Sequence, residues 1–126
     1  MRSFMLLLAL IGALALGVPA ALAATGSGGG ITVTVSLSET ATAGEEFTVA
    51  ESIENTTTRA KLVRVTQTLE GPDGTVFSIR YPLFIPAGKT LAFEFTFTFP
   101  AGVPPGTYTL TLTAGEATAS ADTLVS

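Results

Sequence analysis

The chain has 126 residues, a formal net charge of −4, and no cysteine, histidine or tryptophan. This length fits a single domain. Without cysteine and histidine, the chain cannot form a disulfide framework, a zinc finger, an iron–sulfur site, a thiol nucleophile or a Ser-His-Asp triad. The acidic balance and the lack of any basic run argue against a nucleic-acid partner.

The first 23 residues have the order of parts that marks a secretory signal peptide. Arg2 supplies a positive charge, residues 4–18 form an almost unbroken apolar run, and the segment ends in small residues that include Ala21 and Ala23. We expect cleavage between Ala23 and Ala24. The alternative is an uncleaved anchor, because the apolar run approaches the roughly 20 residues of a spanning helix. The mature chain is expected to lack a membrane span and to be extracellular, periplasmic or envelope-associated.

Strand patterns begin after a short glycine-rich segment. Residues 24–30 contain no large side chain, so we expect a flexible leader there. From residue 31 onward apolar and polar residues alternate with a period of two, which is typical of strands with one buried face. The expected strands are 31–38, 47–55, 63–69, 76–81, 91–99, 107–114 and 117–125.

Turn residues separate these strands at intervals of about ten residues. The clearest turn is Gly71-Pro72-Asp73-Gly74, because proline presets one φ angle and Asp-Gly tolerates positive φ. Residues 82–88 are expected to be a proline-bounded crossover. Strand 91–99 carries one leucine and four phenylalanines on one face, so we expect it to lie centrally in its sheet.

The pattern predicts an all-β fold in which residues 31–126 form a seven-stranded antiparallel immunoglobulin-like β-sandwich. A closed barrel is the alternative architecture. The one-sided alternation argues against a parallel sheet that is buried on both faces.

Four segments resemble the immunoglobulin-like modules of prokaryotic secreted and surface proteins. They are the strand 47–55, which ends in asparagine, the turn 71–74, the Pro-Ala-Gly-Lys turn 86–89, and the Pro-Gly-Thr-Tyr-Thr-Leu segment 105–110. They are similar to the cell-adhesion-related bacterial class and to the sandwich module associated with alpha-galactosidases. The resemblance covers residues 31–126 and implies an accessory unit of a larger system. It also implies that Tyr108 is a tyrosine-corner residue whose hydroxyl binds nearby backbone, and no functional residue carries over.

Glu51 occupies an unusual polar position, because a regular strand would point its carboxylate into the core. Burial of an unpaired charge costs several kcal/mol, so we expect a β-bulge or a frayed strand end to turn Glu51 toward solvent. The alternatives are a functional carboxylate and a hydrogen-bonded pair with Gln67, which has the inward parity of the following strand.

The other acidic residues are scattered and lack the close spacing of a calcium loop. We therefore expect no metal, no cofactor and no catalytic residue. A small hydrolase is the alternative that two converging carboxylates near a cleft would support. Asn55-Thr56-Thr57 forms an N-glycosylation sequon.

Three large apolar residues, Leu83, Phe84 and Ile85, stand between two prolines. We expect them to cap the core, and an exposed Phe84 would make them candidate partner-contact residues. The function favoured by the sequence is a non-catalytic secreted or envelope-associated module, monomeric or weakly oligomeric, that binds a protein or a surface glycan. Carbohydrate binding is the alternative, although the chain has no tryptophan for stacking on sugars.

Overall fold

The computed structural model describes residues 21–126, so the predicted signal peptide lies outside the described residues except for its last three positions. These residues form nine strands: β1 Ala21–Gly28, β2 Ile31–Ser38, β3 Thr40–Ala41, β4 Glu46–Asn55, β5 Lys61–Gly71, β6 Gly74–Ile85, β7 Thr90–Thr98, β8 Gly106–Ala114 and β9 Ala117–Val125.

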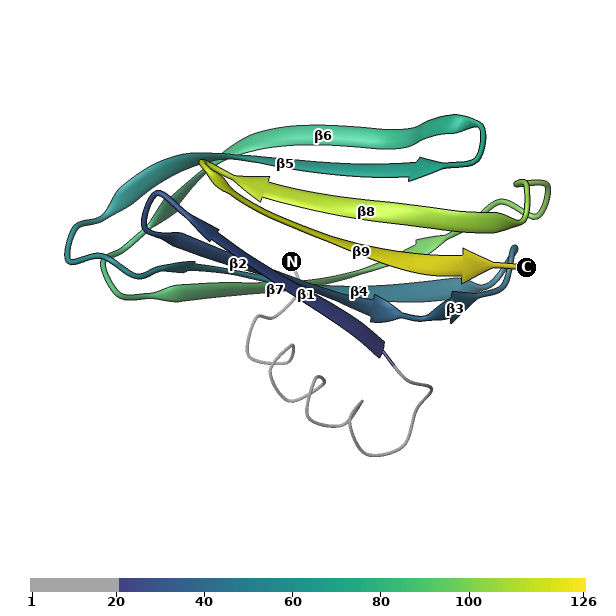
Figure 1. Ribbon diagram of the computed structural model, residues 1–126, viewed down its shortest axis with the longest axis horizontal. Coiled ribbons are helices and arrows are strands. Elements are labelled where there is room, and N and C mark those ends of the chain that lie inside the picture. The colour runs from purple at the N-terminus through teal and green to yellow at the C-terminus, as the bar shows by residue number, and fades with distance from the viewer. Residues whose placement is uncertain (1–20) are drawn as a thin grey trace.

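The strands build two sheets that pack face to face (Figure 1). The first sheet has the order β1-β2-β4-β7, and the second has the order β3-β9-β8-β5-β6. The pairs are antiparallel except for the two-residue β3, which runs parallel to β9. The predicted β-sandwich is therefore confirmed, and the alternative of a closed barrel is wrong. The prediction of seven strands is corrected to nine within residues 21–126, because β1 and β3 were not expected.

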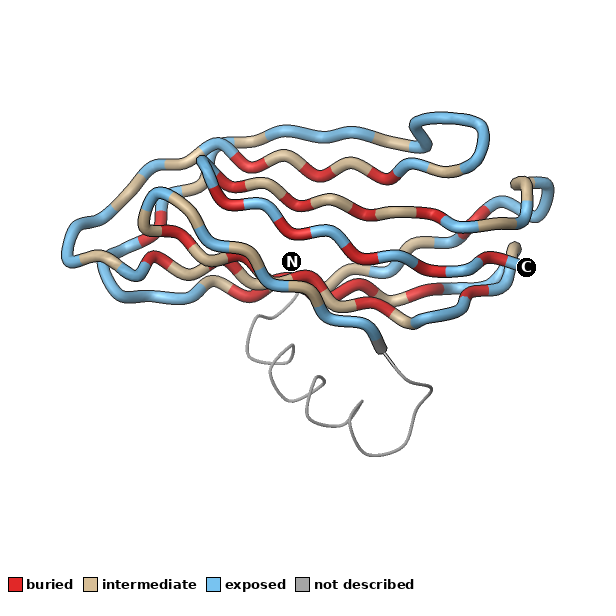
Figure 2. Tube along the Cα trace, viewed as in Figure 1, coloured by how far each residue is buried: buried red, intermediate tan, exposed pale blue. Residues whose placement is uncertain are grey.

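The core lies between the sheets and is made by alternate residues of each strand (Figure 2). In β2, for example, Ile31, Val33, Val35 and Leu37 are buried, while the residues between them are half-buried. Side chains of successive strand residues point to opposite faces, so the period-two pattern of the sequence becomes an inner apolar face and an outer polar face.

The glycine-rich segment is a strand rather than the flexible leader that the sequence suggested. Residues 21–28 pair with β2 along their whole length, and Gly29 and Gly30 form the turn with positive φ angles. The glycines let β1 lie close to β9. A Cβ atom added at Gly26 would overlap the carbonyl oxygen of Thr118, and one added at Gly28 would lie 2.6 Å from the carbonyl oxygen of Glu116. Lack of side chains therefore serves close backbone approach at this position.

The region 82–88 was predicted as a crossover, but its residues 82–85 are the end of β6 and residues 86–88 alone form a connection. Residues 82–85 pair with residues 61–64 of β5, and β6 lies at the edge of its sheet. Pro82 is compatible with this position because an edge strand has one side on which no backbone donor is required.

The aromatic strand β7 is also an edge strand, paired only with β4, so the prediction that it lies centrally is wrong. An apolar row shows that one face of a strand is buried. It contains no information about how many of the strand's backbone edges are paired.

Two predicted local features are confirmed. The turn between β5 and β6 places Gly74 at a φ of 112°. Tyr108 is 2% exposed, and its hydroxyl donates a 2.6 Å hydrogen bond to the carbonyl oxygen of Pro104. Tyr108 therefore has the structural role of a tyrosine corner.

Candidate functional site

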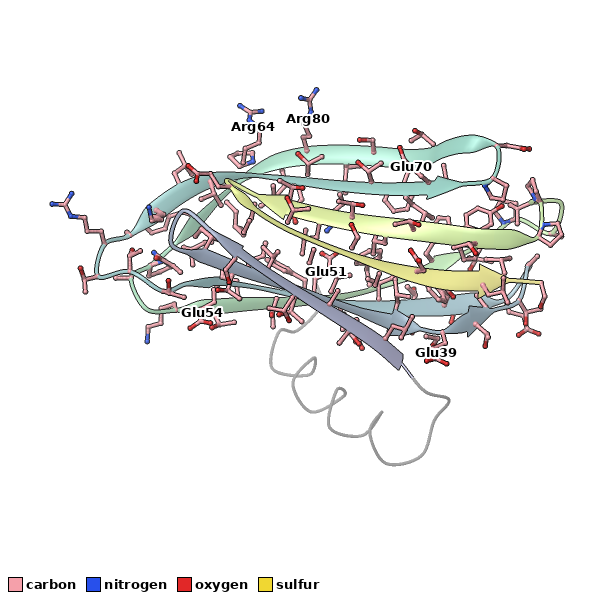
Figure 3. The ribbon with its side chains drawn as sticks, in the orientation of Figure 1. Glu39, Glu51, Glu54, Arg64, Glu70 and Arg80 are labelled. Atoms are coloured by element: carbon pink, nitrogen blue, oxygen red, sulfur yellow. The ribbon has the colours of Figure 1, made fainter. Side chains whose placement is uncertain are left out.

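The buried carboxylate of Glu51 lies at the centre of the sandwich (Figure 3). Strand β4 is regular at this point: Glu51 is paired with Val35 of β2 on one side and with Phe93 of β7 on the other, without a register shift. Its side chain consequently follows the strand's alternation and points between the sheets, where it is 2% exposed. The expectation that a bulge turns Glu51 to solvent is wrong.

Gln67 of the opposite sheet is the partner of this carboxylate. Its Nε2 donates a hydrogen bond of 2.5 Å to Glu51 Oε1, so the suggested Glu51–Gln67 pair is formed. Gln67 also shares a hydrogen bond with the hydroxyl of Tyr81 on β6. The three side chains form a polar chain that runs from the middle of the core to the edge strand β6.

The second oxygen of Glu51, Oε2, is buried and has no hydrogen-bond partner among the described residues. Burial raises the pKa of Glu51 from 4.5 to about 7, and the hydrogen bond from Gln67 offsets part of this effect. Burial and the nearby charge of Glu51 also raise the pKa of Tyr81, which the hydrogen bond to Gln67 partly counteracts. A carboxyl group with a pKa near 7 is half ionised at neutral pH, so small changes in its surroundings can charge or discharge it.

A groove opens beside this polar chain, between the edge strands β6 and β7. We call it the seam groove. It has a volume of about 380 Å³, and its lining includes Gln67, Phe77, Ile79, Tyr81, Phe93 and Phe95. Glu94 is also part of the lining, but strand alternation points its side chain to the face opposite to that of Phe93 and Phe95. The seam groove is thus a mainly aromatic cleft whose wall includes Gln67, with Glu51 buried behind it.

A second feature lies on the outer face of the β5–β6 hairpin. Leu62 is 72% exposed and Phe84 is 60% exposed, and the two residues are directly opposite in the register of the hairpin. Arg64 and Arg80 project from the same face (Figure 3). We call these four residues the hairpin patch.

The structure separates the three residues that the sequence grouped as candidate contacts. Phe84 points outward, whereas Leu83 is half-buried and Ile85 is fully buried in the core. Of the three, Phe84 is therefore the one available to a partner in the folded chain, and Ile85 caps the core as expected. Leu62 was missed, although its parity is opposite to that of its core neighbours Val63 and Val65.

Asn55 of the N-glycosylation sequon lies at the end of β4, and its side chain has a structural role. Asn55 is fully buried, and its Nδ2 donates to the carbonyl oxygens of Arg59 and Ile85 at 2.7 and 3.0 Å. Its Oδ1 accepts hydrogen bonds from the backbone N–H and the hydroxyl of Thr57. The folded chain hides the amide that a glycan would modify.

Residues 21–126 contain no group of three or more acidic, histidine or cysteine side chains arranged to hold a metal ion. They also contain no helix of the length and apolarity that crossing a membrane requires.

Comparisons with known proteins place this sandwich among accessory domains. Residues 41–116 match the family model described as the NPCBM-associated, NEW3 domain of alpha-galactosidase. No protein of curated function matches the chain.

Solved structures share the fold at low sequence identity. A beta-glucosidase mutant from Listeria innocua aligns with a TM-score of 0.61 and 17% identity, over 76% of this chain and 16% of that protein. The sporulation control protein Spo0M from Bacillus subtilis aligns at 0.60 and 21%, over 77% of this chain and 49% of that protein. The alkylpurine DNA glycosylase AlkC from Pseudomonas fluorescens aligns at 0.61 and 13%, over 79% and 31% respectively. At these identities the likeness shows the fold alone, and in each case the chain corresponds to less than half of the solved protein.

Proposed function

Because the chain belongs to the NPCBM-associated NEW3 domain family, we propose that it is a non-catalytic accessory module that contacts another protein through the hairpin patch. The module acts in a secreted or envelope-associated system. This location rests on the signal-peptide pattern of residues 1–23.

The observation that carries this proposal is the exposure of Leu62 and Phe84 side by side on a strand pair. Single exposed apolar residues are ordinary on protein surfaces, but an adjacent pair on a rigid hairpin is a preformed contact. Arg64 and Arg80 frame the pair, and arginine is enriched at protein interfaces while it also provides bidentate donors for carboxylates. The matching partner surface is apolar at its centre and acidic around it.

The same residues favour a protein over a glycan. Sugar recognition by sandwiches relies on exposed planar aromatic side chains that stack on the ring. Phe84 is the one exposed aromatic residue within residues 21–126, and its cross-strand neighbour is the aliphatic Leu62.

The contact uses side chains rather than addition of a partner strand to β6. Pro82 has no backbone N–H and interrupts the row of donors along this edge. Arg80 and Phe84 flank Pro82 on the outer face of β6. Their side chains are available to contact a partner.

The test places the photo-reactive residue p-benzoylphenylalanine at position 84 of the full chain in the cells that produce it. We expect one dominant protein adduct, identified by mass spectrometry, that disappears when Leu62→Asp or Arg64→Glu is added. The matched control has the same photo-reactive residue at Ser120, which is exposed on the outer face of the same sheet, and it should not capture that protein.

Equal capture from positions 84 and 120, or no protein adduct from position 84, would contradict the proposal. Recovery of glycan adducts alone from position 84 would replace it with carbohydrate binding.

A further inference from the structure

The seam groove has the chemistry of a site for an organic cation, and it is separate from the hairpin patch. Its walls present four aromatic rings, those of Phe77, Tyr81, Phe93 and Phe95. The face of an aromatic ring carries negative electrostatic potential and attracts ammonium groups, and the attraction grows when the cation is shielded from water. Several rings around one cleft are the usual arrangement for holding a methylated ammonium ion.

The charges around the groove have the sign that such a ligand needs. No lysine or arginine lines the groove. Behind the wall, Glu51 gives one oxygen to Gln67 and keeps Oε2 without a partner. Val35 of β2 and Phe93 of β7, the residues paired with Glu51, are apolar, and Tyr81 of β6 is the titratable group coupled to it. The described structure thus contains a buried acid that lacks a cationic partner beside a cleft that attracts cations.

The size of the groove limits the ligand to a small head group. A volume of about 380 Å³ lies near the lower end of the range of small-molecule sites. A trimethylammonium group with a short tail fits this space, and its apolar methyl surface suits the aromatic walls. From this geometry we propose that the seam groove binds a small alkylammonium ion, held by Phe77, Tyr81, Phe93 and Phe95 and balanced by Glu51.

Binding of a cation should be linked to the ionisation of Glu51. Without a ligand, burial holds the pKa of Glu51 at about 7. A positive charge nearby favours the carboxylate, so binding lowers that pKa and releases part of a proton at neutral pH. The affinity should rise as pH increases through 7, by about tenfold between pH 6 and pH 8 when the cation binds the ionised form.

The test compares two molecules of the same shape and different charge on the full chain. Choline and its uncharged isostere 3,3-dimethylbutan-1-ol are titrated by calorimetry at pH 6 and pH 8, in two buffers with different ionisation enthalpies. We expect at least a tenfold preference for choline at pH 8, a loss of that preference toward pH 6, and proton release that accompanies choline alone.

Three variants locate the site. Glu51→Gln removes the charge with little change in volume, so it should abolish both the pH dependence and the proton release. Ile79→Arg adds a guanidinium to a groove-lining residue that is 47% exposed and outside the core, and it should abolish choline binding. Leu62→Arg makes the corresponding change at an exposed residue of the hairpin patch and should leave choline binding intact.

Equal affinity for choline and its uncharged isostere would overturn the proposal. Choline binding that survives Ile79→Arg unchanged would also overturn it, and this variant does not depend on how well the core tolerates a change at Glu51.

Discussion

The strands pack differently on the two sides of this sandwich. On one side β1 lies against β9, where glycines on β1 and the inward alanines 117, 119 and 121 of β9 allow the backbones to come close. On the other side the inward residues of β6 and β7 are mostly aromatic, and they leave a groove of about 380 Å³. Small residues have closed one side, and large residues have kept the other open.

One side of this small domain is thus closely packed, and the other side has features suited to binding. Around Gly26 the backbones of β1 and β9 leave no room for a ligand, because even an added methyl group there would overlap Thr118. The open side has half-buried aromatic rings, a buried carboxylate with one unsatisfied oxygen and an edge strand that bears exposed apolar residues. These features do not improve stability, and such features are typical of functional surfaces.

The largest expected effect on stability comes from replacing phenylalanine with alanine at two positions of the segment 91–99. Phe99 is fully buried and its ring packs 5.0 Å from those of Phe97 and Tyr108, so Phe99→Ala should lower the free energy of unfolding by about 3–5 kcal/mol. Phe95 is half-buried beside the groove, and Phe95→Ala should cost about 1–2 kcal/mol. Urea denaturation of both variants measures the difference between their free energies of unfolding. Equal losses would show that the residues around the seam groove are packed as tightly as the core.

The pH dependence of stability tests the burial of Glu51. In the unfolded chain this carboxyl loses its proton near pH 4.5, and in the folded chain near pH 7. The folded state therefore binds more protons between these values, and the free energy of unfolding should fall by about 3 kcal/mol as pH rises from 4.5 to 7. Glu51→Gln should remove this fall. Glu54→Gln, a change at an outward position of the same strand, should retain it, and a wild-type curve parallel to that of Glu51→Gln would show that Glu51 is exposed.

The closed side is tested by adding volume where the backbones meet. Gly26→Val should destabilise the domain by about 1–3 kcal/mol, because the backbone of β9 cannot move away as a flexible side chain would. Ser27→Val next to it is exposed and suits a strand, so it should change stability by less than about 0.5 kcal/mol. Thermal melts of the two variants measure this difference in stability. A neutral Gly26→Val would mean that β1 does not lie on β9.

The smallest effect on stability is expected at the hairpin patch. Phe84→Ser removes a side chain that is 60% exposed, so the free energy of unfolding should change by less than about 0.5 kcal/mol. Recovery of the partner protein in a pull-down from cells should nevertheless fall strongly. A large loss of stability in Phe84→Ser would identify Phe84 as a packing residue and not a contact residue.

Most of the fold was predictable because alternation is a local property. The period of two in residues 31–125 gave each of the main strands, and Gly71-Pro72-Asp73-Gly74 gave the turn of the hairpin. The order of strands in a sheet is not local, which is why β7 was expected in the centre and lies at an edge. The glycine-rich strand β1 was missed because it has no apolar alternation, and the strand β9 on which its glycines pack lies far along the sequence.

The candidate site was predictable only in part for a related reason. Parity placed Glu51 and Gln67 on inward faces, but the energetic cost of a buried carboxylate argued for an irregular strand. The hydrogen bond from Gln67 crosses between the two sheets, and the sequence contains no signal for which inward residues of opposite sheets will meet. The exposure of Leu62 could be predicted from its outward parity in the strand pattern. The seam groove could not be predicted, because it depends on the relative position of two edge strands, which only the fold defines.

The most direct test of a buried acid behind the seam groove is an NMR titration of the Glu51 side-chain carboxyl in the folded chain. The signal is assigned by comparison with Glu51→Gln. Burial of Glu51 should place the titration midpoint near pH 7. A midpoint near 4.5, the ordinary value for glutamate, would show that water reaches this carboxylate freely and that the seam groove is not backed by a buried acid.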